Sequence, residues 1–403
     1  MQELLFLAHR IPYPPNKGDK IRSWNILKYL AGQYRVHLGC FIDDPEDERH
    51  RPVLEEICES CFFARLDPRL ARLRSLTGLL SGAPLTLPYF SNRRLADWAA
   101  GLMRARDIGH VFTFSSSMAQ YATGPEAAAA CRVVDYVDVD SDKWRQYAAA
   151  KSWPANWIYG RESRTLLQFE RRVATESDAC LFVSEAEASL FRDLAPESSD
   201  KIRALNNGVD FDYFDPSIGL EPPFDSDADT LVFTGAMDYW ANVDAVVWFA
   251  REIFPAIRAQ RPAAEFWIVG ARPAQQVTAL ASLGGVHVTG SVPDVRPYVK
   301  HARVVVAPLR LARGVQNKVL EAMAMARPVV ASPEALEGID ADIGRDVLSA
   351  GSIPEFVDTV CGLLGRADAN AIGENARRRV VEGYGWPANL SVLKTILEHR
   401  PVD

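Results

Sequence analysis

The residues best suited to chemistry lie between Arg313 and Ala331, in the order polar loop, helix and buried strand. The helix carries Lys318 and, roughly one turn further on, Glu321. Free N–H groups in the first turn of a helix can bind a diphosphate, and Lys318 adds a positive charge there. The carboxylate of Glu321 could accept hydrogen bonds from both hydroxyls of a ribose. The segment therefore predicts a nucleotide site, and the alternative is an amphipathic helix with a solvated lysine and glutamate.

Two residues prepare the start of this helix. Gly314 lets the backbone turn tightly before it, because glycine has no Cβ. Asn317 is expected to cap the first turn with its side chain. Both features favour a helix that presents its N-terminus to a ligand.

A second candidate site follows the first predicted strand, in residues 9–22. The prolines of this loop oppose an early helix, and Gly18 would permit close approach of the backbone to a ligand. Three basic side chains could meet a phosphate or an anionic acceptor: Lys17, Lys20 and Arg22. The predicted acceptor-side residues are Lys17, Asp19 and Arg22. The alternative is a solvated loop whose glycine serves only its conformation.

Acidic side chains recur from Asp135 to Asp142, after another predicted strand, and include a D-x-D motif. Such acids could hold Mg²⁺ or Mn²⁺. We favour another interpretation, because the anion-binding helix lies in the other half of the chain and no separate metal is required. Asp138 follows the strand end most closely, so we expect its carboxylate to line a cleft.

Strand-like apolar runs alternate with helical stretches, which predicts an α/β protein with parallel sheets covered by helices on both faces. A chain of 403 residues suits two domains of about 200 residues each. The alternation pauses near Asp215 and from Glu221 to Asp229, where prolines and acids oppose regular structure. We therefore predict one domain over residues 1–212 and a second over residues 213–383, with residues 384–403 crossing back to the first.

Both halves supply strands to this prediction. The strands of the first half are Leu4–Ala8, Val36–Ile42, His110–Thr113, Arg132–Asp135 and Ala179–Ser184. Those of the second half are Leu231–Gly235, Glu265–Val269, Val286–Thr289, Val304–Ala307 and Val329–Ala331. Neither half has a dinucleotide-binding G-x-G-x-x-G or a P-loop after its first strand. Two such domains are expected to face a central cleft with the carboxyl ends of their strands.

Composition and charge exclude other classes of protein. A net charge of -7 argues against a general nucleic-acid binder. No apolar run approaches the roughly 20 residues needed to span a bilayer, and the N-terminus lacks a basic leader, so we expect a cytoplasmic protein. Basic residues interleaved with Leu and Phe between Arg65 and Arg106 leave peripheral contact with the inner face of a membrane open. Cys58 and Cys61 form a lone C-x-x-C, which we interpret as structural.

Ordered motifs give the chain a family resemblance. They are Val183-Ser184 with Glu187, Asn207-Gly-Val-Asp210 with Phe214 and Pro216, the second-domain opening from Gly235 to Asn242, and Glu321-Ala-Met-Ala-Met-Ala-Arg-Pro-Val-Val330. In this order they resemble the retaining glycosyltransferases of family 4, which have two Rossmann-like doubly wound domains, the GT-B fold. Within that family the chain is similar to sugar transferases of bacterial exopolysaccharide loci.

The resemblance implies a hexosyltransferase that moves sugar from a UDP- or GDP-linked donor to a glycan or polyprenyl-linked acceptor. It implies retention of the anomeric configuration, stabilisation of the departing diphosphate by positive groups, and no metal or other cofactor. It assigns the ribose to Glu321, the diphosphate to Lys318, and the base to the loop from Gly290 to Asp294. The implied donor-binding residues are Gly18, Gly235, Asn242, Ser291, Val292, Gly314, Asn317, Lys318, Val319 and Glu321. The implied catalytic residues are Asp138, Arg313 and Lys318.

The chain also departs from the family pattern. An E-x7-E pair would need an acid where this chain has Arg313, which we expect to bind the diphosphate or an acidic sugar. Ala326 replaces a common glycine, and Asp138 stands in for a common histidine. An Arg–Lys pair after the first strand of the second domain is missing, so Lys318 and Arg313 are expected to supply its charge. Two alternatives stay open: a nucleotide-sugar epimerase or hydrolase of the same fold, and a non-catalytic nucleotide-sugar-binding subunit.

Overall fold

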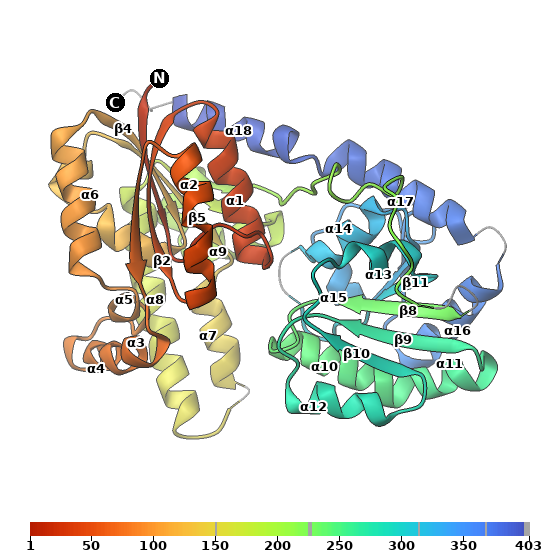
Figure 1. Ribbon diagram of the computed structural model, residues 1–403. Helices are drawn as coiled ribbons and strands as arrows, with labels where there is room; N and C mark the ends of the chain where they lie inside the picture. The colour runs from red at the N-terminus through yellow and green to blue at the C-terminus, as the bar shows by residue number, and fades with distance from the viewer. Residues whose placement is uncertain (150, 225–227, 313–314, 367–368, 399–403) are drawn as a thin grey trace. The chain divides into compact units, whose positions relative to one another are not determined.

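The computed structural model describes residues 1–149, 151–224, 228–312, 315–366 and 369–398 (Figure 1). The chain divides into two compact units. Unit 1 comprises Met1–Asn206 and Pro387–Asp403, and unit 2 comprises Asn207–Trp386. Each unit has its own parallel sheet and its own buried core.

Within the described residues, unit 1 is built on a seven-stranded parallel sheet of order β3-β2-β1-β4-β5-β6-β7. Its strands are β1 (Glu3–Ala8), β2 (Arg35–Ile42), β3 (Ser60–Arg65), β4 (Ile108–Phe114), β5 (Cys131–Val137), β6 (Ala179–Phe182) and β7 (Ile202–Ala204). The side chains from Leu4 to Ala8 are fully buried, as expected for a central strand that is covered on both faces. The strand order reverses between β1 and β4, which makes the carboxyl ends of these two strands the expected position of a site.

The helices of unit 1 connect these strands (Figure 1). They are α1 (Gly18–Ala31), α2 (Arg51–Ile57), α3 (Pro68–Ser75), α4 (Thr77–Ser81), α5 (Thr86–Tyr89), α6 (Arg93–Ala105), α7 (Asp140–Ala149), α8 (Ala155–Glu176), α9 (Glu185–Leu194) and, from the end of the chain, α18 (Trp386–Glu398). The apolar side of α6 shows the packing principle, because its Leu95 and Ala99 form one cluster with Leu5 and Leu7 of β1. A periodic apolar stripe on the helix thereby covers the apolar sheet face.

Within the described residues, unit 2 has a six-stranded parallel sheet of order β10-β9-β8-β11-β12-β13. Its strands are β8 (Asp229–Thr234), β9 (Ala264–Val269), β10 (Val286–Gly290), β11 (Val304–Ala307), β12 (Val329–Ala331) and β13 (Leu348–Ser349). Its helices are α10 (Trp240–Trp248), η5 (Phe249–Ile253), α11 (Phe254–Gln260), α12 (Gln275–Thr278), α13 (Arg296–His301), α14 (Asn317–Ala324), α15 (Pro333–Leu336), α16 (Ile353–Gly365) and α17 (Ala369–Gly383). The strand order reverses between β8 and β11.

Every strand predicted from the sequence is present, with ends within two residues of those expected. The strands that the sequence did not reveal are β3 and β13, and each lies at an edge of its sheet. The side chains of β3 are mostly half-buried, and β13 spans only two residues. Short or partly exposed edge strands lack the continuous apolar run by which central strands are recognised.

Candidate functional site

Helix α14 of unit 2 lies where the strand order reverses. It follows β11, and β11 pairs with β8 in the sheet. Ligands of open α/β sheets bind at the carboxyl ends of strands at such a reversal. The helix begins at Asn317, so Gln316 and not Asn317 occupies its cap position. The expected capping role of Asn317 is therefore wrong, and its Oδ1 instead accepts a hydrogen bond of 3.1 Å from Nδ2 of Asn207.

Lys318 is held by two other residues of unit 2. Its Nζ donates a hydrogen bond of 2.6 Å to Oδ1 of Asn242 and lies 4.5 Å from the centroid of the Phe233 ring. Burial lowers the pKa of Lys318 to about 7, and the negative charge of Glu321 opposes this shift. A diphosphate beside the ammonium would supply a further negative charge and favour the protonated form. Lys318 is therefore placed to bind an anion.

The carboxylate of Glu321 is largely surrounded by protein. Its side chain keeps some exposed surface, yet enough protein surrounds the carboxylate to raise its pKa to about 7, an effect opposed by the charge of Lys318. Within the described part of the chain, the carboxylate has no hydrogen bond or ion pair. A desolvated carboxylate without hydrogen bonds is unfavourable. Hydroxyl groups of a ligand would satisfy it.

Two glycines make room for the residue that orients Lys318. A Cβ on Gly235, which directly follows β8, would lie 2.7 Å from Nδ2 of Asn242. A Cβ on Gly270, which follows β9, would lie 1.7 Å from the carbonyl oxygen of Gly235. Nδ2 of the buried Asn242 donates to the carbonyl of Ala236, which turns its Oδ1 toward Lys318. The predicted residues Gly235 and Asn242 thus act on the same part of unit 2 as Lys318.

The loop after β10 holds the other predicted donor-binding positions of unit 2. Ser291 is exposed and Val292 is partly buried, so their contact with a base stays a prediction. Nearby, Asp294 binds Arg296 over 2.7 Å, and the Arg296 guanidinium lies 3.9 Å from the centroid of the Tyr213 ring. Burial raises the pKa of Tyr213, and the charges of Asp294 and Glu321 add to the increase.

Tyr213 was not among the residues expected at the site. Its hydroxyl donates to Asp294 over 3.4 Å, and the charge of Glu321 contributes to the raised pKa of Tyr213. Its position between Asp210 and Phe214, two residues of a family motif, was the available sequence signal. An aromatic ring that is partly exposed beside a carboxylate and a guanidinium could contact a ligand.

Three further residues in the region of α14 were predicted to belong to the site: Arg313, Gly314 and Val319. Arg313 and Gly314 lie outside the described residues. Val319 is fully buried in the core of unit 2, and its N–H donates to the carbonyl of Gln316 over 2.9 Å. The expected donor contact of Val319 is therefore wrong, because its position on the helix turns it toward the sheet.

A charged cluster lies in unit 1 after the carboxyl ends of β1 and β2. Arg10 binds Asp43 over 2.9 Å and Asp19 over 2.5 Å, while Nε2 of His9 lies 3.5 Å from Asp19. Burial alone would raise the pKa of Asp19, but hydrogen bonding with His9 and the charge of Arg10 lower it far below its ordinary value. Asp19 is thus ionised. The other members of the cluster, His9, Arg10 and Asp43, directly follow the ends of β1 and β2, and the sequence shows this position.

Lys17 and Gly18 lie at the start of α1 in the same unit. Lys17 occupies the cap position with a half-buried side chain, and Gly18 is the exposed first residue of the helix. Their predicted contacts with acceptor and donor remain predictions.

Lys20 and Arg22 point into unit 1. Lys20 is 2% exposed and binds Asp47 over 2.6 Å. Arg22 is 1% exposed, with its Nε 2.8 Å from Asp135 and its Nη1 donating to the carbonyl of Leu205. The predicted acceptor contact of Arg22 is therefore wrong, because its charge joins β5 to the chain after β7. A buried guanidinium is stable only with such charged and polar partners.

The backbone adopts an uncommon conformation where Asp138 leaves β5. Val137 has a φ of 69°, and the N–H of Asp138 donates to the carbonyl of Tyr136 over 3.0 Å. This i to i+2 bond with positive φ is the rare and strained form of the γ-turn. Ser115, which directly follows the neighbouring strand β4, also has a positive φ, 77°. Strained residues concentrate at functional sites, which favours the carboxyl ends of β4 and β5 as part of one.

The acids of the D-x-D region do not converge on one point. Asp135 binds Arg22, and Asp142 binds Arg145 over 2.5 Å. Over the described ranges, no three His, Cys, Asp or Glu side chains lie close enough together to hold a metal ion. Asp138 remains the member of this run that directly follows the strained turn.

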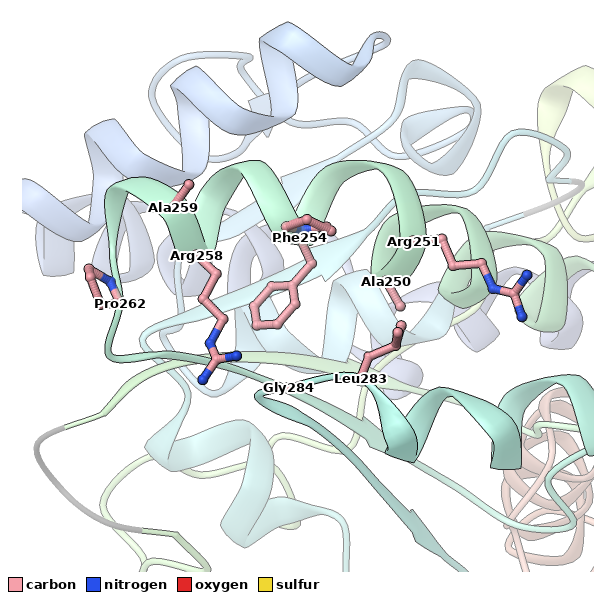
Figure 2. A pocket seen from close by; sticks show the side chains of 9 residues that line it. Ala250, Arg251, Phe254, Arg258, Ala259, Pro262, Leu283 and Gly284 are labelled. Atoms are coloured by element: carbon pink, nitrogen blue, oxygen red, sulfur yellow. The ribbon is translucent and has the colours of Figure 1, made fainter.

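A hollow of about 570 Å³ on unit 2 lies away from this site (Figure 2). Its lining includes Arg251, Phe254, Arg258, Leu283 and Gly284, and Figure 2 shows Arg258 reaching toward Gly284. These residues precede β9 and β10, whereas Lys318 follows the carboxyl end of β11. The hollow therefore borders the edge of the sheet opposite to the one where ligands of this fold bind.

Models of two protein families match the chain. The model described as Glycosyltransferase Family 4 matches residues 21–213, and the model described as Glycosyl transferases group 1 matches residues 228–366. Together the matches include most of α1 and all of β5, β8 and α14. A comparison with curated proteins finds no match.

Solved structures with a similar fold span nearly the whole chain. HepE of Anabaena, in complex with UDP and glucose, is 16% identical with a TM-score of 0.68, over 98% of this chain and 99% of that chain. Sucrose-phosphate synthase of Thermosynechococcus elongatus is 17% identical with a TM-score of 0.71, over 98% of each chain. WaaG, a glycosyltransferase involved in lipopolysaccharide biosynthesis, is 14% identical with a TM-score of 0.65, over 98% of this chain and 100% of that chain. The two parallel sheets and these neighbours show the GT-B fold.

Proposed function

The chain belongs to the family 4 glycosyltransferases, and on this premise we propose that unit 2 binds a nucleoside-diphosphate hexose at α14 for transfer to a glycan or lipid-linked acceptor. The observation that carries the proposal is the desolvated carboxylate of Glu321, without a described partner, one turn from the ammonium of Lys318. A ribose would supply hydroxyl donors to the first group, and a diphosphate would supply negative charge to the second. Both belong to a single ligand.

We take a uridine nucleotide as the first donor to test. The structures of Anabaena HepE contain UDP with glucose, or UDP-glucose. A guanosine nucleotide is the second choice. The exopolysaccharide context belongs to the proposal as the setting in which a lipid-linked or growing glycan would be the acceptor.

The proposed reaction proceeds with retention at the anomeric carbon. The bond from C1 of the hexose to the phosphate oxygen breaks, and the acceptor oxygen bonds to C1 on the same face. The acceptor proton passes to the departing phosphate oxygen, so a nucleoside diphosphate is released. Lys318 and the first N–H groups of α14 would stabilise the negative charge that develops on the leaving group. In this proposal these groups take the place of a metal ion.

Titration calorimetry with UDP, GDP and ADP tests the donor site. We expect one nucleotide to bind, and expect Glu321→Ala and Lys318→Ala each to weaken that binding by about 10–100-fold. Arg345→Ala is the control, because Arg345 is exposed elsewhere on unit 2. Nucleotide affinity that survives Glu321→Ala unchanged would contradict the ribose contact. Sugar release from the bound donor without dependence on an acceptor would favour a hydrolase.

A further inference from the structure

Large apolar side chains of unit 1 are exposed on two segments. On α3, on α4 and at the residue between them, Leu70, Leu73, Leu76 and Leu80 are each more than half exposed, and Leu80 reaches 93%. Their spacing of three or four residues matches one side of a helix. Before and in the first turn of α8, Trp153 and Trp157 are also more than half exposed. We call these six side chains the Leu–Trp surface.

Hydrogen bonds join the two segments of the Leu–Trp surface. Arg161 of α8 donates to the carbonyls of Gly78, in α4, and Ala83, just after it, over 2.7 and 3.1 Å. Trp157 lies four residues before Arg161 and therefore on the same side of α8. Figure 1 shows α3, α4 and the start of α8 at the same end of unit 1. The leucines and tryptophans thus belong to one region of the surface.

The exposed charges on the two segments are mostly positive, and the acid beside them is Asp67, the exposed cap of α3. No acidic residue occurs between Asp67 and Asp97, whereas Arg69 and Arg72 of α3 are exposed and make no ion pair within the described residues. Lys151 and Arg164 are exposed near the tryptophans. Glu162 is the acid of this part of α8, and it is 2% exposed because the backbone N–H groups of α5 and its preceding residue bind it. A positive surface on a chain of net charge -7 is complementary to an anionic partner.

We propose that the Leu–Trp surface docks unit 1 on the anionic face of a lipid bilayer. The leucines would enter the acyl region, the tryptophans would occupy the interface, and Arg69 and Arg72 would contact anionic headgroups. Within the described residues, no helix combines the length and hydropathy needed to cross a bilayer, so this contact would be peripheral. The inference deepens the proposed transfer to a lipid-linked acceptor and rests on that function for its purpose.

Co-sedimentation of the full chain with phospholipid vesicles tests this surface. We expect binding to vesicles that contain phosphatidylglycerol, weaker binding to vesicles of phosphatidylcholine alone, and a loss of affinity as salt is added. Leu73→Ser with Leu80→Ser should reduce partitioning by at least about tenfold, since each leucine contributes several buried carbon groups. Arg69→Gln with Arg72→Gln should reduce it by about tenfold on the anionic vesicles and leave phosphatidylcholine unaffected.

The control is Leu283→Ser with Val392→Ser, which removes two exposed apolar side chains from other places. Nucleotide affinity measured on the same preparations separates this inference from the donor site. Wild-type protein that binds its nucleotide but ignores phosphatidylglycerol vesicles would overturn the proposal. Surface variants that sediment like the wild type would overturn it too. Self-association that the leucine variant abolishes, without vesicle binding, would instead identify a second copy of the chain as the occupant.

Discussion

Lys318 donates a hydrogen bond of 2.6 Å to Asn242, which joins the beginnings of α14 and α10 across 76 residues of sequence. The amide can take this orientation because Gly235 has no Cβ to displace it. The bond holds the ammonium at the carboxyl edge of the sheet, where it would meet a diphosphate. Asn242, which is uncharged, thus positions the ammonium of Lys318.

Replacement of Asn242 should therefore weaken nucleotide binding. Asn242→Ala removes the acceptor for Lys318, and we expect about a tenfold loss of affinity for the nucleotide in calorimetry, because a charged hydrogen bond is lost. Asn375→Ala provides the control, since its amide contacts the exposed carbonyl of Arg345. Equal affinities for the wild type and Asn242→Ala would show that Lys318 is positioned by other means.

Glu321 should make the ligand-free protein less stable as the pH rises. Its pKa is raised from 4.5 to about 7, so the folded protein holds the proton more tightly than the unfolded chain does. The resulting stability is present below about pH 4.5 and is lost as the pH rises to about 7. Glu321→Gln removes this dependence, and we expect its melting temperature at pH 8 to exceed that of the wild type by roughly 2–4 °C.

Melting curves at several pH values check this expectation. The difference between Glu321→Gln and the wild type should shrink toward pH 5, where the wild-type carboxyl is protonated in the folded state. The exposed Glu337→Gln serves as the reference substitution. A difference that stays constant with pH would mean that protonation of Glu321 does not cause it.

Replacement of Ala326 by glycine should stabilise the folded protein. It follows α14 with a φ of 53°, and the N–H groups of Ala326 and Arg327 donate to the carbonyls of Met323 and Ala322, the pattern of a Schellman motif. Glycine tolerates this left-handed conformation better, so we expect Ala326→Gly to raise the free energy of unfolding by about 1 kcal/mol. Denaturant titration measures the change. Ala324→Gly, inside the helix, should have the opposite sign.

Asp138 should affect transfer more than donor binding. If Asp138 contacts the transferred sugar, as the sequence predicts, we expect Asp138→Asn to reduce the transfer rate by about 100-fold or more, while the nucleotide Kd stays unchanged. Asp140→Asn is the matched control on the following helix. The test is the rate of nucleotide release from the preferred sugar nucleotide. A parallel loss in nucleotide affinity would place Asp138 at the donor, not at the transferred group.

Arg313 should determine the choice of donor, a prediction that rests on the sequence. Arg313→Glu restores the acid of the family pattern, and we expect the ratio of kcat/KM for neutral over acidic sugar nucleotides to change by about tenfold. Arg313→Lys retains the charge and should retain the preference. If both variants keep the wild-type ratio, this side chain does not contact the sugar.

Most of the framework followed from local patterns. Apolar runs such as Leu4–Ala8 revealed the central strands, and the alternation with helices revealed the parallel sheets. Lys318 and Glu321 could be paired from their spacing alone, since a helix brings residues three apart to one side. Edge strand β3 was not predicted from the sequence, because its residues are only partly buried.

Tertiary structure decided which charged residues are available to a ligand. Arg22 and Lys20 looked like free cations in the sequence, but Asp135 and Asp47, which lie 113 and 27 residues away, hold them inside unit 1. The sequence predicted a donor contact for Val319, but the structure buries its side chain on the side of the helix that faces the sheet. The sequence by itself determined the fold class, the family and the helix that carries Lys318, because periodicity and motifs are local properties of the chain. Folding alone decided the pairing of charges, because burial brings distant residues together and leaves each buried charge stable only beside its partner.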